Sequence, residues 1–265
     1  MLRYHGSKWR LAPWVLSHFP PHQCYVEPFG GGASILLRKP RAKIAVLNDM
    51  DSEIVNVYRM IRERPGELRR LLEMTPFARD ELNAAFSPSE DPLEKARRTL
   101  VKSFMTVSSA GCTRSRRASS FRALRRATNH PAQDWASYPS FLESFASRLR
   151  GVVIENRDAL DVIRAHDGAG VLTYVDPPYP LGTRSDRDSY RHEMSDQDHR
   201  DLGSALKACR GMVIVSSYDC PLYREIYAGW RMAGMRAFTV GGAARPEALW
   251  LSPNVGCGGL LEGWA

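Results

Sequence analysis

The sequence predicts one α/β domain that is interrupted by a basic, mainly helical insertion. Two observations support this fold class. Strand-like and helix-like segments alternate in the first 64 residues and again after residue 150, which is the signature of a parallel sheet. Between these stretches the alternation disappears and basic residues accumulate. A chain of 265 residues is long enough for one such domain with a sizeable insertion.

The N-terminal part shows two strands and two helices in alternation. A strand at 25–27 leads through a glycine-rich loop into a helix that is expected to begin at Ala33. A second strand at 44–47 is followed by Asp51, which is a plausible helix cap. Apolar residues then recur at helical spacing until Pro65 ends the run.

Residues 65–150 are expected to form the insertion, with several helices and a loop or hairpin at 108–129. From Glu90 to Arg150 there are 12 basic and 5 acidic residues, an excess of +7 in a chain whose net charge is +8. A charge run is often only a solvated face. Arginines mixed with Ser, Thr and Asn are also typical of a surface that holds phosphates. We therefore expect the insertion to contact nucleic acid.

The alternation resumes after residue 150 and continues to the end of the chain. The predicted elements are a strand at 152–154, a helix at 160–163, a strand at 171–175, a helix at 202–206, a strand at 212–216, a helix at 222–227 and closing strands at 238–240 and 248–251. The sequence thus predicts a main domain made of residues 1–64 and 151–265, with the insertion at 65–150.

The composition excludes several classes of protein. With 43% hydrophobic and 25% charged residues, the chain is neither disordered nor a small disulfide scaffold. No apolar run approaches the ~20 residues that a membrane span needs, and no secretory signal is visible. No C-x-x-C pair occurs, so neither a zinc site nor a dithiol redox site is expected. We expect reduced thiols and a cytoplasmic location.

Two loops at expected strand ends suggest a nucleotide-like ligand. The glycines at 30–32 would let a ligand approach the backbone closely, although a tight turn without any ligand fits them equally well. Asp49, about 20 residues later, could accept both hydroxyls of a ribose, or it could simply form an Asx turn. Neither G-x-G-x-x-G nor a Walker lysine is present. The pattern favours an adenosine-containing cofactor without a pyrophosphate.

The most specific motif is Asp-Pro-Pro-Tyr at 176–179, directly after a strand of buried type. Two prolines remove backbone donors and fix φ, which leaves a stiff turn rich in carbonyl groups. Such a turn could present the Asp176 carboxylate and the Pro177 carbonyl to one amino group. Tyr179 would be available to stack on a planar ring.

These motifs and their order resemble the Dam-type (D12 class) DNA adenine-N6 methyltransferases. The resemblance extends over most of the chain and rests on the segments 4–8, 27–32, 48–49, 158, 176–179, 190–193, 198–199, 216–219 and 247–250. The departures from the family pattern are Ser7 in place of the second glycine of the N-terminal element, and Ala33 where a third spaced glycine is often found.

The resemblance implies a Rossmann-like S-adenosylmethionine-dependent methyltransferase fold with an inserted, mainly helical basic DNA-recognition subdomain. It implies binding of the cofactor S-adenosylmethionine by Tyr4, Lys8, Glu27, Phe29, Gly30, Gly31, Gly32, Asp49, Asp158 and Asp176. It implies a catalytic element made of Asp176, Pro177, Pro178 and Tyr179. The candidate DNA-binding residues in the basic stretch are Arg114, Arg116, Arg117, Arg122, Arg125 and Arg126.

The expected reaction is methylation of the adenine N6 amine in a specific double-stranded DNA sequence, without a metal and on a flipped-out base. The chain would be a stand-alone modification enzyme, as in restriction–modification. Three alternatives stay open at this point: an RNA adenine or DNA cytosine-N4 methyltransferase, a catalytically inactive DNA-binding relative, and a methyltransferase that acts on something other than nucleic acid. The basic insertion counts against the last alternative. The intact motif at 176–179 together with Asp49 counts against an inactive relative.

Overall fold

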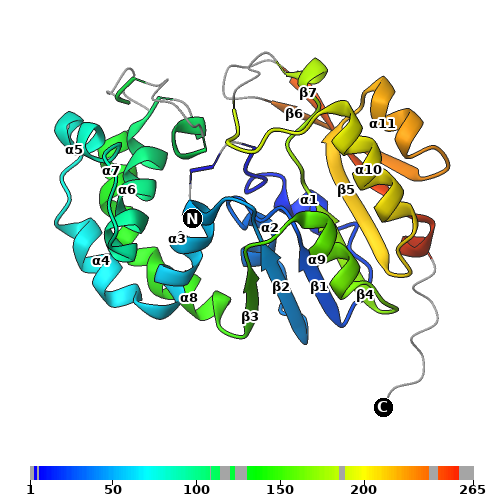
Figure 1. Cartoon of the computed structure of the whole chain (residues 1–265), viewed down its shortest axis with the longest axis horizontal. Coiled ribbons are helices and arrows are strands. Elements are labelled where there is room, and N and C mark those ends of the chain that lie inside the picture. The colour runs from blue at the N-terminus through cyan, green and yellow to red at the C-terminus, as the bar shows by residue number, and fades with distance from the viewer. Residues whose placement is uncertain are drawn as a thin grey trace.

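A seven-stranded sheet in the order β3-β2-β1-β4-β5-β7-β6 forms the centre of the protein (Figure 1). The computed structural model describes residues 3–4, 6–107, 109–113, 120–122, 130–184, 189–238 and 244–256. The strands are β1 (Cys24–Glu27), β2 (Ile44–Asn48), β3 (Val152–Glu155), β4 (Val171–Val175), β5 (Met212–Tyr218), β6 (Arg231–Phe238) and β7 (Ala244–Leu251). The α/β class predicted from the sequence is confirmed.

The sheet is mixed, whereas the alternating pattern alone predicted a parallel one. β1 to β5 run parallel, and β7 pairs antiparallel with β5 and with β6. Only residues 239–243 separate β6 from β7, and so short a connection can join antiparallel strands but not parallel ones. The strand order reverses between β1 and β4. In open α/β sheets ligands bind at such a switch point, outside the carboxyl ends of the strands.

Helices cover both faces of the sheet, and the two-residue periodicity of the strands explains why. Leu172 and Tyr174 of β4 join the apolar core on one face, while Val175 joins the core on the other. The first face packs against α1 (Ala12–Leu16), α2 (Ser34–Arg38) and α3 (Ser52–Glu63). The second packs against α9 (Ala159–His166), α10 (Asp196–Lys207) and α11 (Pro221–Ile226).

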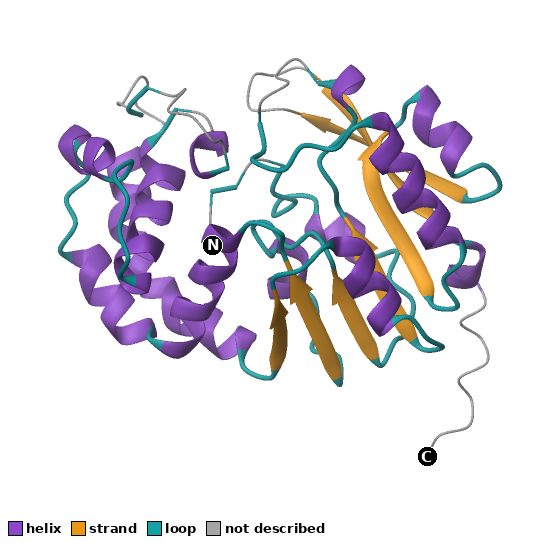
Figure 2. Cartoon of the chain, viewed as in Figure 1, coloured by secondary structure: helices purple, strands orange, loops and turns teal. Residues whose placement is uncertain are grey.

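The segment between α3 and β3 is mainly helical in its described residues, apart from loops and an isolated β-bridge between Thr106 and Phe121, and it gathers beside α3 on one side of the sheet (Figure 2). Its helices are α4 (Pro65–Glu73), α5 (Arg79–Ala84), α6 (Pro92–Met105), η1 (Ser109–Cys112), α7 (Pro131–Ser137), η2 (Tyr138–Phe141) and α8 (Leu142–Leu149). Leu68, Leu100 and Trp135 belong to the same apolar cluster as Leu47 of the sheet. The division into two domains therefore stays a prediction.

Most predicted elements lie where the sequence placed them. The closing strand expected at 238–240 is an exception, because β6 spans Arg231–Phe238 and residues 239 and 240 lie outside the described residues. Asp51 caps α3 as expected, because its carboxylate accepts a hydrogen bond from the backbone N–H of Glu53. The short helices α1, α5 and α7 were not predicted, since five to seven residues are too few to show a helical period.

Two remaining expectations concern membranes and thiols. None of the described helices has the length and apolar character needed to cross a membrane. Cys24, Cys112, Cys209 and Cys220 are free thiols, and Cys257 lies outside the described residues. Within the described part of the chain, no three His, Cys, Asp or Glu side chains are grouped as metal ligands would be.

Candidate active site

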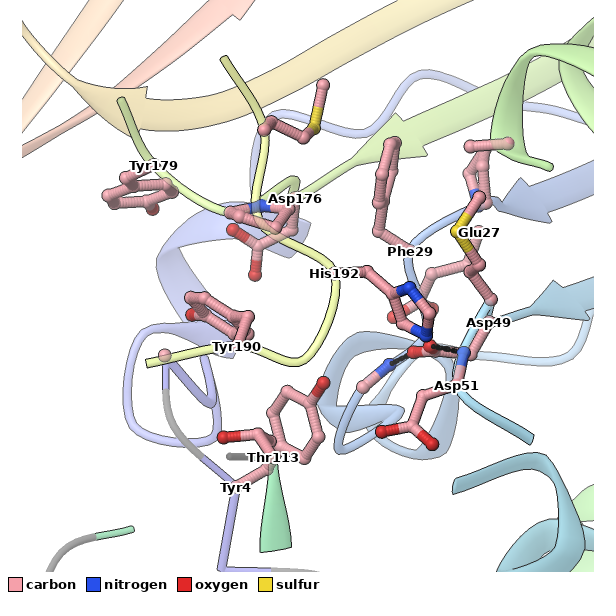
Figure 3. A pocket seen from close by; sticks show the side chains of 18 of the residues that line it. Tyr4, Glu27, Phe29, Asp49, Asp51, Thr113, Asp176, Tyr179, Tyr190 and His192 are labelled. Atoms are coloured by element: carbon pink, nitrogen blue, oxygen red, sulfur yellow. Dashed lines mark hydrogen bonds between the residues drawn. The ribbon is translucent and has the colours of Figure 1, made fainter. Parts of the chain in front are cut away.

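A cavity of about 610 Å³ opens at the carboxyl ends of β1, β2 and β4 (Figure 3). This volume is in the range of small-molecule sites, which span about 300–1,000 Å³. Residues from the N-terminal segment and from the loops after these strands line it. Among them are the predicted residues Tyr4, Lys8, Glu27, Phe29, Gly30, Gly31, Gly32, Asp49, Asp158, Asp176, Pro178 and Tyr179. Pro177 is buried and does not line the cavity.

The glycine turn after β1 forms one wall of the cavity. Gly31 has φ +47°, and a Cβ atom there would lie 2.6 Å from the Tyr4 ring. A side chain at this position would therefore be strained and would also clash. Ala33 has the same φ of +47°, which costs an alanine about 1 kcal/mol relative to glycine. The family pattern often has glycine there, so the departure at Ala33 keeps the turn but strains it.

Asp49 ties the glycine turn to the start of α3. Its Oδ2 accepts a 2.7 Å hydrogen bond from the Gly31 N–H, and its Oδ1 accepts a 2.9 Å bond from the Asp51 N–H. Burial raises the pKa of Asp49 to about 6, although the two backbone donors lower it. Each carboxylate oxygen keeps a second lone pair. Asp49 can therefore hold the turn and still accept hydrogen bonds from a ligand.

Asn48 links the loop after β1 to the loop after β3 at the edge of the cavity. Its amide donates to the Pro28 carbonyl at 2.8 Å and to the Arg157 carbonyl at 3.0 Å, and it accepts from the Arg157 N–H. The sequence grouped Asn48 with Asp49 but gave no sign of this role. The adjacent Asp158 caps α9 by accepting from the Leu160 N–H at 2.8 Å.

Glu27 lines the cavity, yet its hydrogen bonds are made to the protein. Its Oε2 accepts from the Tyr25 hydroxyl at 2.8 Å and from the Leu36 N–H at 3.1 Å, which anchors α2 to β1. Burial raises the pKa of Glu27 to about 8. We therefore interpret Glu27 as a positioning residue for the glycine turn, whereas the resemblance placed it among the cofactor ligands.

This buried carboxyl predicts that stability falls as the pH rises from 6.5 to 8. The folded-state pKa of Glu27 lies above its ordinary value of 4.5, so the folded protein binds more protons than the unfolded chain across this window. Glu27→Gln keeps an oxygen acceptor and has no proton to lose. In thermal unfolding, wild type should lose stability between pH 6.5 and 8, and the variant should lose clearly less. Equal losses in the two proteins would contradict the assignment.

The opposite wall is formed by Asp176 and Lys8. Lys8 Nζ lies 3.0 Å from Asp176 Oδ1 and 4.7 Å from the centre of the Tyr179 ring. Burial raises the pKa of Asp176 to about 6, while Lys8 opposes this shift. Burial would lower the pKa of Lys8, but Asp176 and then Glu247 raise it above its ordinary value. Lys8 is therefore a cation at neutral pH and fixes one oxygen of Asp176.

Tyr179 is held in place by residues of the neighbouring strands. Its hydroxyl donates to Glu247 Oε2 at 2.8 Å and lies 3.1 Å from Ser216 Oγ, and its ring meets Tyr218 edge-on. Glu247 and Ser216 were part of the family resemblance but were not among the predicted site residues. Their partner is distant in the sequence, so only the folded sheet reveals the contact.

The sequence also missed the segment after the Asp-Pro-Pro-Tyr turn. Several of its residues line the cavity together with Thr113: Arg184, Ser189, Tyr190, Arg191, His192, Glu193 and Met194. Residues 190–193 had appeared only as part of the resemblance.

The model of one protein family, described as D12 class N6 adenine-specific DNA methyltransferase, matches residues 4–238. The chain belongs to this family. The match includes every described wall of the cavity except the one formed by β7.

Individual methyltransferases are similar to the chain over most of their length. The type II methyltransferase M1.LlaDCHI of Lactococcus lactis subsp. cremoris is 28% identical over 260 residues, covering 91% of this chain and 88% of the relative. The DNA adenine methylase of Salmonella typhi is 26% identical over 242 residues, covering 85% and 83%. That of Escherichia coli K12 is 25% identical, with the same coverage. The protein is an adenine-specific DNA methyltransferase.

Several basic residues of this methyltransferase are paired with carboxylates or backbone carbonyls. Less positive charge is therefore available at the surface than the number of lysines and arginines suggested. Lys102 pairs with Glu53 at 2.8 Å, and Arg97 pairs with both Glu94 and Glu81 at 2.7 Å. Arg148 donates to two backbone carbonyls of the α2 region. These cations stabilise the helices, so they contribute less to a phosphate-binding surface than the +7 excess predicted.

Of the six candidate DNA-binding arginines, Arg122 is described. It lies 3.2 Å from Asp134, and its backbone follows the bridge between Thr106 and Phe121. The other five, Arg114, Arg116, Arg117, Arg125 and Arg126, lie outside the described residues. Their contact with DNA stays a prediction.

Proposed function

We propose that the protein transfers the methyl group of S-adenosylmethionine to the N6 amine of adenine within a specific double-stranded DNA sequence. The observation that carries this proposal is the Asp176 carboxylate, which lies in the cavity with one oxygen fixed by Lys8 and with the glycine turn on the opposite wall. Membership of the family shows that the reaction is methylation of adenine in DNA. The identity of the methyl donor, the double-stranded form of the substrate and the roles of the residues belong to the proposal.

The glycine-turn side of the cavity fits the cofactor. Glycines at 30–32 leave its wall bare, Phe29 offers a planar ring, and the anchored Asp49 carboxylate can accept ribose hydroxyls. S-adenosylmethionine supplies an electrophilic methyl group on a sulfonium when it is bound. Tyr4 packs on Gly31 and closes this part of the cavity from the N-terminal side.

The Asp176 side fits the target base. The lone pair of the adenine amine is delocalised into the ring, so the amine is a weak nucleophile. Asp176 Oδ2 would accept one of its hydrogens and so localise that lone pair toward the methyl group. The Pro177 carbonyl, which the sequence suggested for the second hydrogen, does not line the cavity, so Asp176 carries this role in the proposal. A nitrogen–carbon bond would form as the sulfur–carbon bond of the donor breaks, and the surplus amine proton would leave to Asp176 and then to solvent.

A base inside a duplex cannot reach this buried carboxylate, so it would have to be flipped out and held against Tyr179. The hydrogen bonds of Tyr179 to Glu247 and Ser216 fix its ring before any base arrives. Arg114, Arg116, Arg117, Arg122, Arg125 and Arg126 would contact phosphates and base edges around the site. Similarity to the type II methyltransferase M1.LlaDCHI of Lactococcus favours a role in restriction–modification. A cytoplasmic location also stays a prediction.

The decisive experiment incubates the purified protein with S-adenosylmethionine and unmethylated plasmid DNA, and identifies the nucleosides by mass spectrometry. We expect 6-methyladenine, and sequencing of the product should place it in one recurrent sequence. A product of 4-methylcytosine would refute the choice of base. Methylation of RNA, but not of duplex DNA, would refute the substrate.

A further inference from the structure

A hydrogen bond joins the segment that carries the candidate recognition arginines to the loop that lines the base side of the cavity. The Thr113 hydroxyl donates to the carbonyl of Ser189, and both residues are fully buried. Thr113 immediately precedes Arg114 in the sequence, whereas Ser189 opens the loop 189–194. The contact therefore connects the segment that is expected to bind DNA with the loop beside the expected site of the target base.

Thr113 is held firmly from its own side. η1, which ends next to it, packs so closely on the end of α6 that a Cβ on Gly111 would lie 2.0 Å from the Thr106 hydroxyl. The backbone nearby is also paired, because the Val107 N–H donates a 2.9 Å hydrogen bond to the Ser120 carbonyl. The Thr113 hydroxyl is therefore a fixed point from which the Ser189 carbonyl is held.

On the other side, the loop 189–194 places Tyr190 against Tyr4 and Gly6 and near Asp176. The Tyr190 ring centre is 6.4 Å from that of Tyr4, and its hydroxyl lies where a Cβ on Gly6 would come within 2.8 Å. In Figure 3, Tyr190 lies between Asp176 and the wall formed by Tyr4 and Thr113. The nearby Asp176 charge and, above all, burial raise the pKa of Tyr190.

Hydrogen bonds and ion pairs within the loop 189–194 and to α3 hold its backbone in place. Glu193 Oε1 accepts from the backbone N–H groups of Ser189 at 2.9 Å and of Tyr190 at 3.0 Å, and Glu193 also pairs with Arg184. Arg191 lies 3.3 Å from Glu53 and also pairs with Asp51. Because Ser189 and Tyr190 share one acceptor, the carbonyl that Thr113 holds and the ring of Tyr190 should move together.

We propose that Thr113 is a positioning residue for methyl transfer, because its hydroxyl holds the Ser189 carbonyl and thereby keeps Tyr190 in place beside Asp176. This inference rests on the proposed function, since it concerns how the base side of that site is held.

The test compares Thr113→Val, Thr113→Ser and a control, Thr75→Val, with wild type. Valine matches the shape of threonine but cannot donate to Ser189, whereas serine keeps the hydroxyl. Thr75→Val removes a 2.7 Å hydroxyl bond to the Leu71 carbonyl and the acceptor of a 3.2 Å bond from Arg97, both away from the cavity. Single-turnover methylation of plasmid DNA, calorimetric titration of S-adenosylmethionine, DNA binding and thermal unfolding are measured for each protein.

We expect Thr113→Val to slow single-turnover methylation by about 10- to 100-fold, the range expected for a misplacement near 1 Å. Its affinities for cofactor and DNA should stay within about threefold of wild type, since neither ligand is held by this hydroxyl. Thr113→Ser should restore most of the rate. Should valine prevent folding, Thr113→Ala leaves room for water at the Ser189 carbonyl and takes its place.

Three results would overturn the inference. These are an unchanged rate in the valine variant, a loss of affinity as large as the loss of rate, and a serine variant that is as slow as the valine variant. A wild-type protein that methylates no DNA would instead refute the proposed function, so the two failures are distinguishable.

Discussion

Replacing Asp176 with alanine is expected to abolish methylation while DNA binding is retained. The variant loses the carboxylate that would accept an adenine hydrogen and aim the amine. We expect a rate at least ~1,000-fold lower, which is about 4 kcal/mol of the ~7–11 kcal/mol that orientation can contribute. The measurement is single-turnover methylation of plasmid DNA, with DNA binding measured in parallel. Substantial activity in the alanine variant would refute the mechanism.

The same substitution should also destabilise the fold, and this effect must be separated from catalysis. Lys8 is 4% exposed, so the loss of Asp176 leaves a buried cation without its closest anion. Breaking such a pair costs about 3–5 kcal/mol. The double variant Lys8→Met, Asp176→Asn removes both charges and should recover stability without recovering activity. Asp161→Asn, whose side chain is 53% exposed on α9, is the matched control and should behave as wild type.

The pH profile of methylation offers a check on the same residue. The pKa of Asp176 is raised to about 6, and a protonated carboxyl cannot accept both Lys8 and the adenine amine. The single-turnover rate should therefore fall as the pH decreases below about 6. Asp49 shares this pKa, so the cofactor must be saturating throughout.

Replacing Asp49 with alanine is expected to weaken cofactor binding by about 100-fold, or about 2.7 kcal/mol. The change removes the acceptor for the proposed ribose hydroxyls. It also leaves the N–H groups of Gly31 and Asp51 without their carboxylate, so the glycine turn and the start of α3 lose their common anchor. Asp49→Asn keeps one oxygen and should lose less, about tenfold.

Calorimetric titration with S-adenosylmethionine measures this effect, with Asp161→Asn again as the control. Because Asp49 must be ionised to accept from the cofactor, wild-type affinity should weaken below about pH 6. The alanine variant should show little pH dependence in that range. A folded alanine variant that binds the cofactor as tightly as wild type would exclude Asp49 from the site.

The sequence predicted the five parallel strands and the loops that form the cavity because both signals are local. A parallel strand carries its own run of apolar residues, and the chemistry follows directly at its carboxyl end, as at Glu27, Asp49 and Asp176. The topological rule for open sheets then brings these ends together. The short helices α1, α5 and α7 escaped prediction because tertiary packing, not a repeating pattern, stabilises them.

The charge pattern was a weaker guide for a physical reason. Counting lysines and arginines gives the charge of a segment but not the partners of each cation. Lys102 is paired with Glu53 of α3, which lies outside the basic segment and was not counted against it. The Arg148 guanidinium donates hydrogen bonds to backbone carbonyls, which carry no formal charge and so do not enter a count of charges.

The sequence by itself therefore determined the α/β class, the family resemblance and the residues that surround the cavity. Only the tertiary structure decided how those residues are paired: Lys8 with Asp176, Tyr179 with Glu247, and Thr113 with Ser189. Each pair joins segments that are far apart in the chain. Such contacts depend on the strand order and on the helices packed beside the sheet, and no local pattern encodes either of these.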